Sequence, residues 1–207
     1  KYPNILSKVF RDFWSITEQA HQAIIASLAA HISGQKIQFY EPESKPVVQG
    51  RGSYFEAGST AVIPVFGILG KHLSGFEMEC GGCSMDAVAA MLDVAAASPR
   101  IETIVLDINS PGGTVTGTPE LAQKIYDISR DKEVVAFTDA DCCSGALWLA
   151  SQADVFYATP SSEIGSVGVR MILLDYSKAL EEEGVKVNPI FSGKYKLLGA
   201  SFKPLED

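Results

Sequence analysis

The sequence has little basic charge, few cysteines and few histidines. Its 17 Lys and Arg are outnumbered by 25 Asp and Glu, which gives a formal net charge of −8. This balance disfavours nucleic-acid binding, because phosphates are held mainly by Lys and Arg. Four cysteines among 207 residues are too few for a disulfide scaffold and are compatible with a reducing compartment.

Long apolar runs are also missing. The best one, 23–32, is shorter than the roughly 18–20 residues of a spanning helix and is interrupted by Ser27 and His31. The sequence therefore predicts no membrane span in this chain. It starts at Lys1 without a signal sequence, which predicts that the first residues were removed and leaves a lost signal or anchor open.

The apolar pattern changes along the chain. Apolar residues recur every four positions from Ile16 to Ile32 and predict a helix over about 15–31, within an N-terminal helical extension, 1–34. Residues 35–58 are polar and rich in Pro and Gly, which predicts a flexible linker. Residues 59–207 are the predicted main domain.

Within this domain, short apolar runs alternate with segments of helical periodicity. The predicted strands are 61–66, 103–108, 134–137 and 154–158, and the predicted helices are 84–97, 119–129, 145–152 and 176–183. Such alternation is typical of crossover units and predicts an α/β layered fold.

Two turns are candidates for chemistry. Residues 109–113 (Asn-Ser-Pro-Gly-Gly) follow a predicted strand, and their backbone N–H groups could bind an anion or simply form a turn. Ser144 begins the helix predicted at 145–152. It is either a helix cap or a nucleophile, since the helix start and the Gly145 N–H would stabilise an oxyanion.

A nucleophilic serine needs a base. The three histidines, at positions 21, 31 and 72, all precede Ser144, and the pattern places none of them beside it. A lysine base must be buried, because its pKa must fall by about three units from near 10.4 to leave it neutral at pH 7. Lys194 and Lys196 are both candidates, and the residues alone favour neither over a surface role.

Five segments in a fixed order resemble the signal peptide peptidase A (SppA) family of serine peptidases, and especially the head-maturation (capsid) proteases of tailed phages. The segments are 61–67 (AVIPVFG), 108–113 (INSPGG), 144–146 (SGA), 164–169 (IGSVGV) and 192–196 (SGKYK). This resemblance covers 61–207 and implies a ClpP/crotonase-like fold, a spiral of ββα units.

The resemblance also implies roles for individual residues. Ser144 would be the nucleophile and Lys196 the general base, and Ser166 would orient the lysine amine. The N–H groups of Gly113 and Gly145 would form the oxyanion hole.

Gly112 would let the turn approach the site closely. The resemblance calls for no metal or organic cofactor. It implies a homo-oligomeric ring or dome in which serine and lysine in some members come from neighbouring subunits.

Two features depart from the family pattern, and a second pair of cysteines is interpreted separately. Cys142 and Cys143 precede the serine, so a cysteine nucleophile is an alternative. Cys80 and Cys83 have a CxxC spacing and are interpreted as a loop or a disulfide, because a zinc site would need a second ligand pair. The chain also ends soon after Lys196, which predicts a truncated C-terminal part.

The predicted function is that of a serine endopeptidase working through an acyl-enzyme on extended peptide segments with small or apolar side chains. Its partners would be phage or prophage scaffold, portal or capsid proteins in the bacterial cytoplasm. The alternatives are an SppA-type signal-peptide peptidase and an inert assembly protein. An acyl-CoA enzyme of the crotonase type is less favoured, because its usual acidic residues cannot be placed.

Overall fold

The computed structural model describes residues 14–32 and 54–205. Its contacts divide the chain into a core unit, Phe13–Arg170, and a C-terminal unit whose described residues are 171–205. Most of the predicted linker 35–58 lies outside the described residues. The domain boundaries at 34 and 58 therefore stay predictions.

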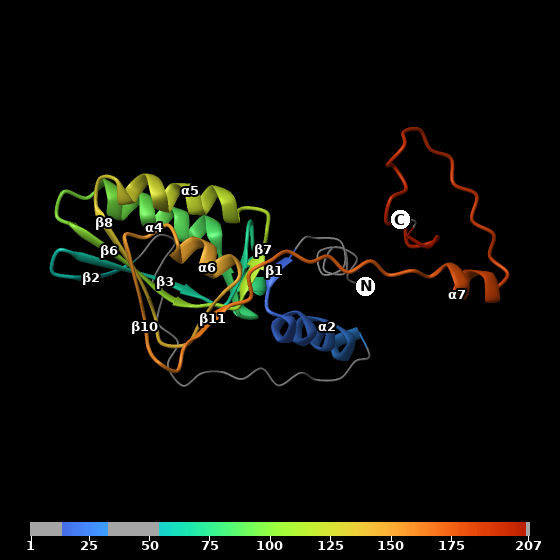
Figure 1. Ribbon diagram of the computed structural model, residues 1–207, viewed down its shortest axis with the longest axis horizontal. Coiled ribbons are helices and arrows are strands. Elements are labelled where there is room, and N and C mark those ends of the chain that lie inside the picture. Colours follow the sequence, from blue (N-terminus) through green and yellow to red (C-terminus); the bar gives the residue numbers. More distant parts are fainter. Residues whose placement is uncertain (1–13, 33–53, 206–207) are drawn as a thin grey trace. The chain divides into compact units, whose positions relative to one another are not determined.

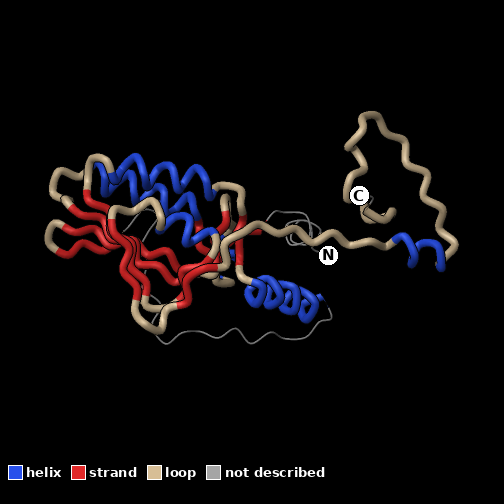
Figure 2. Tube along the Cα trace, viewed as in Figure 1, coloured by secondary structure: helices blue, strands red, loops and turns tan. Residues whose placement is uncertain are grey.

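A five-stranded sheet forms the centre of the core unit (Figures 1 and 2). Its strand order is β10-β8-β6-β3-β2, in which the first four strands are parallel and β2 is antiparallel. The strands are β2 Phe55–Ala57, β3 Thr60–Phe66, β6 Thr103–Asn109, β8 Glu133–Thr138 and β10 Val155–Ala158. Fully buried residues alternate with partly exposed ones along β3 and β6, because successive side chains point to opposite faces.

Shorter strands form two smaller sheets in the core unit. The four-stranded sheet has the order β1-β7-β4-β5, and β9 pairs with β11. Their bounds are β1 Trp14–Ile16, β4 Ile68–Gly70, β5 Gly82–Ser84, β7 Gly112–Thr114, β9 Asp141–Cys143 and β11 Glu163–Gly165.

Three strands of the large sheet, β3, β6 and β8, are each followed by a short strand and a helix. The repeats are β3-β4-α4, with α3 (Gly75–Glu79) and β5 inserted, then β6-β7-α5 and β8-β9-α6. The helices are α4 Met85–Ala97, α5 Thr118–Ser129 and α6 Gly145–Ala150. This order confirms the predicted α/β fold of ββα units.

The three helices cover one face of the large sheet (Figure 1). Ile63, Leu106 and Ile125 are among the fully buried side chains of the core between sheet and helices. The hydroxyl of Ser84 accepts a hydrogen bond from the Ala87 N–H at 3.2 Å and caps α4. The core therefore holds the starts of the helices at the ends of the strands.

The N-terminal helix begins later than its apolar pattern predicts. Helix α2 spans Glu18–Ile32, whereas Ser15 and Ile16, placed in that helix by the pattern, lie in strand β1. Backbone pairing of β1 with β7 overrides the local periodicity, and the Thr17 hydroxyl accepts from the Ala20 N–H at 3.3 Å where α2 starts.

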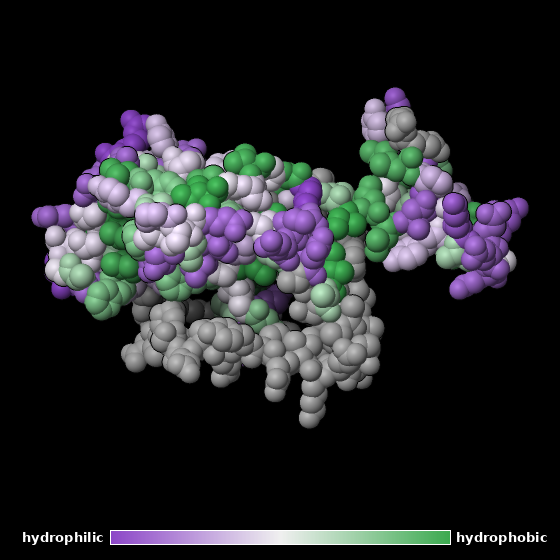
Figure 3. All heavy atoms as spheres, turned by 60° about the horizontal axis from the view of Figure 1, so that its bottom comes forward, coloured by the Kyte–Doolittle hydropathy of each residue, from purple (hydrophilic) through white to green (hydrophobic). Residues whose placement is uncertain are grey.

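The C-terminal unit contains one short described helix, α7 (Ser177–Glu182). None of residues 171–205 is buried, and several large apolar side chains are exposed, including those of Ile190, Phe191, Tyr195 and Leu198. Apolar side chains appear on the surface of both units in Figure 3. Within residues 14–32 and 54–205, no helix has the length and apolar character needed to cross a bilayer.

Candidate functional site

Ser144 lies at a strained turn between strand β9 and helix α6. Its backbone has φ 52° and ψ −114°, a region that residues with a side chain rarely adopt. Its side chain caps no backbone group of the helix, so the structure does not support the cap interpretation. A strained serine at a strand-to-helix turn is the geometry that presents the nucleophilic hydroxyl in α/β-hydrolases.

The segment 165–168 holds Ser144 from one side. The Ser144 N–H donates to the Gly165 carbonyl at 2.7 Å, and the Ser144 hydroxyl donates to the Gly168 carbonyl at 3.4 Å. Ser166 lies between these two contacts, is exposed, and has a positive φ of 52°. The structure therefore brings the segment of Ser166 to Ser144.

The turn 109–113 approaches from the other side. Ser110 forms a bridge with Cys142, and the Ser110 carbonyl accepts from the Cys143 N–H at 3.0 Å. Helix α6 also contacts β7, the strand that contains Gly112 and Gly113. The two turns singled out in the sequence thus meet at one place.

Ser110 shapes this turn, a role that the sequence analysis missed. It is fully buried, its hydroxyl donates to the Gly67 carbonyl at 2.6 Å, and it accepts from the Gly112 N–H at 3.2 Å. The sequence could have indicated this role, because Ser110 lies within the segment 108–113 that resembles the peptidase family. The bonds hold the turn against the end of β3.

The predicted oxyanion glycines are all buried, but for different reasons. Gly112 has φ 100°, which a side chain would disfavour. Gly113 pairs with Leu69, and a Cβ atom there would lie 1.9 Å from the Leu69 carbonyl oxygen. Gly145 begins α6, so its N–H has no acceptor within the helix.

Lys196 belongs to the C-terminal unit. It lies in a turn, its N–H donates to the Gly193 carbonyl at 3.3 Å, and its side chain is exposed. Lys194, the other sequence candidate, has its ammonium 5.2 Å from the centre of the Tyr195 ring. Ser144 belongs to the core unit and Lys196 to the C-terminal unit, so the pairing of these two side chains stays a prediction.

The cysteine alternatives are disfavoured by burial. Burial raises the pKa of the Cys142 thiol to about 12 and also raises the pKa of Cys143, so neither is a ready thiolate at neutral pH. All four cysteines are free thiols, and Cys83 lies buried in β5 rather than in a loop or a disulfide.

The structure describes the contacts of two of the histidines. The His72 ring lies 2.7 Å from the Asp86 carboxylate on the surface, and the His21 ring packs beside Trp14. The side chain of His31 lies outside the described residues.

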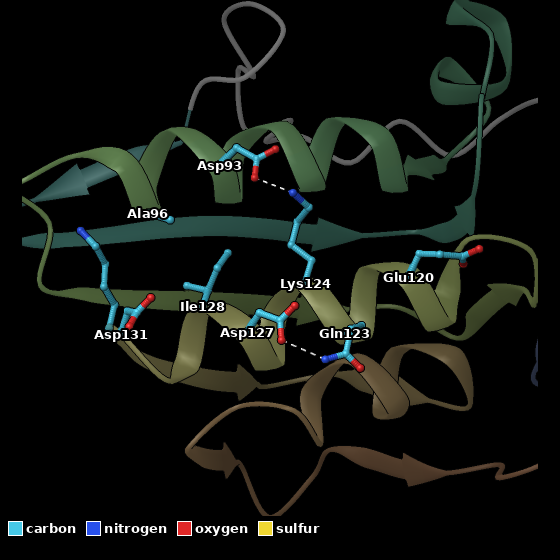
Figure 4. Close-up of a pocket in the computed structure, with 9 residues that line it drawn as sticks. Asp93, Ala96, Glu120, Gln123, Lys124, Asp127, Ile128 and Asp131 are labelled. Carbon is cyan, nitrogen blue, oxygen red and sulfur yellow. Dashed lines mark hydrogen bonds and ion pairs between the residues drawn. The ribbon is translucent and has the colours of Figure 1, made fainter.

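One hollow of the described surface lies away from these residues. It measures about 410 Å³ and is lined by charged side chains of α4 and α5, including Asp93, Glu120 and Asp127 (Figure 4). An ion pair between Asp93 and Lys124 crosses it. None of the predicted site residues lines it, and the described residues contain no group of three or more side chains suited to hold a metal.

The fold and this site define the class of the molecule: an α/β domain of ββα units with a strained serine at a strand-to-helix turn. Residues 127–207 match Peptidase family S49. The chain is 36% identical to the head-tail preconnector protein GP5 of Enterobacteria phage P21, over 73% of this chain and 30% of that protein. It is 31% identical to the capsid assembly protease C of Escherichia phage lambda, over 91% of this chain and 44% of that protein.

These matches confirm the predicted resemblance: the C-terminal part of the chain matches Peptidase family S49, and the chain is similar to two phage proteins. It spans less than half the length of either phage relative. Among solved structures, a probable enoyl-CoA hydratase from Mycobacterium smegmatis is 19% identical with a TM-score of 0.41, over 54% of this chain and 50% of that one.

Proposed function

We propose that this chain is a serine endopeptidase in which Ser144 is the nucleophile and Lys196 the general base. The strained, buried position of Ser144 at the start of α6, between the segment 165–168 and the turn 109–113, carries the proposal. A backbone strain of this kind costs about 1–3 kcal/mol and persists mainly where function requires it.

The proposed chemistry uses the Ser144 hydroxyl, the Lys196 amine and two backbone N–H groups. Lys196 takes the Ser144 proton, the oxygen attacks a peptide carbonyl, and the N–H groups of Gly113 and Gly145 stabilise the oxyanion. The protonated lysine then gives its proton to the leaving amine, and water hydrolyses the acyl-enzyme. Ser166 orients the Lys196 amine, and Gly112 lets the turn at 109–113 approach the site closely.

The relatives' names suggest the setting. One is called a capsid assembly protease and another a head-tail preconnector protein. We therefore propose that the substrates are proteins of phage or prophage head assembly, cut in the bacterial cytoplasm.

We further propose that the chain acts as a homo-oligomer. The exposed apolar side chains of the C-terminal unit, such as Ile190 and Phe191, support this, because large exposed apolar surfaces mark contact sites.

Labelling and cleavage test the activity. In Ser144→Ala, a fluorophosphonate should no longer label the chain, and kcat for cleavage of a peptide panel should fall by roughly 10³-fold or more, because the nucleophile is gone. Labelling is read by intact-mass spectrometry and cleavage by chromatography.

Ser161→Ala is the matched control, since this serine is exposed and its hydroxyl lies 3.4 Å from the Thr159 hydroxyl. It should label and cleave like the parent. Equal rates in the parent and in Ser144→Ala would refute the proposed function.

A further inference from the structure

Strand β1 fills a position between two segments of the candidate site. On one side, the Trp14 N–H donates to the Arg170 carbonyl at 3.0 Å, and the Arg170 N–H donates to the Trp14 carbonyl at 3.1 Å. On the other side, β1 runs antiparallel to β7, and the Thr17 N–H donates to the Pro111 carbonyl at 3.1 Å. Without β1, the edge of β7 and the backbone at Arg170 would lose these partners.

The pairing register places β1 opposite Gly113, the glycine predicted to stabilise the oxyanion. Trp14 directs both of its backbone groups toward Arg170, and neighbouring residues of a strand direct theirs to opposite sides. The backbone groups of Ser15 therefore face β7, where Ser15 stands opposite Gly113. In the proposed function, this is the place of the peptide carbonyl that Ser144 attacks.

We propose that Trp14–Ile16 is an internal occupant of the substrate groove, and that a substrate binds there as an extended strand antiparallel to β7 once β1 withdraws. This inference rests on the proposed function. Addition of a strand to a sheet edge is a general mode of peptide recognition, in which backbone bonds give affinity and alternate side chains give specificity.

The occupant indicates the substrate class. Trp14 is 7% exposed and Ile16 is 4% exposed, so two side chains on the same side of the strand are enclosed. Ser15, the residue opposite Gly113, is small. The groove is therefore suited to a small residue at the cut, flanked on both sides by large apolar residues.

The occupant is held by a clasp that can open. The Arg170 guanidinium donates to the carbonyls of Thr17 at 3.0 Å and Glu18 at 3.3 Å, and it pairs with the Glu18 carboxylate. Among the side chains of α2 that the structure describes, only His21 is buried. Helix α2 therefore adds little to what holds β1, and the cost of local opening is set mainly by Trp14, Ile16 and the Arg170 clasp.

Peptide binding tests the inference without cleavage. The probe is a fluorescein-labelled peptide with the sequence of residues 10–20, titrated into the whole chain carrying Ser144→Ala and followed by fluorescence polarisation. Adding Trp14→Ala should tighten binding about tenfold, because the groove is then vacant in a larger fraction of molecules. Gln19→Ala, at an exposed position of α2, is the matched control and should leave the affinity unchanged.

A second variant guards against misfolding of Trp14→Ala. Arg170→Gln removes the clasp but keeps the Arg170 backbone pairing, and it should tighten binding about threefold. Equal affinity in all variants, or no binding to any of them, would overturn the inference. Failure of the proposed function is separate: it shows as a chain with intact Ser144 that binds the peptide but cleaves none.

Discussion

At the scale of single residues, Gly113 lies so close to a neighbouring strand that there is no room for a side chain. A methyl group there would meet the backbone of Leu69 in β4, which cannot move aside as a side chain can. We expect Gly113→Ala to lower the free energy of unfolding by about 1–3 kcal/mol. Cleavage should fall at least about 10²-fold, because the displaced N–H no longer faces the oxyanion. Calorimetry and peptide cleavage measure the two effects.

Gly75→Ala is the control for this prediction. Gly75 has open space where a Cβ would be placed, so the substitution should leave both unfolding and cleavage unchanged. If Gly113→Ala behaved in the same way, the close approach of β7 and β4 would be contradicted.

At the scale of elements, Lys132 joins the end of α4 to the loop that follows it. Its ammonium donates to the carbonyls of Ala95 at 3.3 Å, Ser98 at 2.6 Å and Ile101 at 2.5 Å. Lys132→Met leaves these carbonyls without a charged donor and should cost about 1–3 kcal/mol. The midpoint of thermal unfolding should fall by roughly 3–10 °C.

Lys186→Met removes an equal charge from an exposed position and should not change that midpoint. A fall of the same size in both variants would mean that net charge, and not the three carbonyls, explains the effect of Lys132.

Most of the longer elements could be predicted from the sequence, and the strands of three residues could not. The runs at 61–66 and 103–108 and the helix at 84–97 agree with β3, β6 and α4 within one residue at each end. Strands of three residues, such as β7 and β9, are too short for periodicity to identify.

Part of the candidate site could also be predicted from the sequence. The segments 144–146 and 108–113 identified Ser144 and the turn at 109–113 as functional candidates. The positive φ of Ser144 and the pairing of β1 with Arg170 depend on residues far away in the chain, so no local pattern could predict them.

At the scale of the whole molecule, the two units differ in what they bury. The core unit encloses a continuous apolar cluster, whereas none of residues 171–205 is buried. A segment of this composition with no core of its own gains stability by packing on another surface. Lys196 lies in that segment, so in the proposed mechanism the surface on which the segment packs would decide which Ser144 the lysine serves.

Mixing two inactive variants tests whether Lys196 serves the Ser144 of a neighbouring copy. Ser144→Ala supplies only the lysine and Lys196→Met only the serine, so each alone should be inactive. When equal amounts are unfolded and refolded together, shared sites should recover about a quarter of the parent rate, because one site in four combines both intact residues in a symmetric oligomer. Ser161→Ala mixed with the parent controls for losses in refolding. A mixture that stays inactive while the oligomer forms would place both residues of each site in one chain.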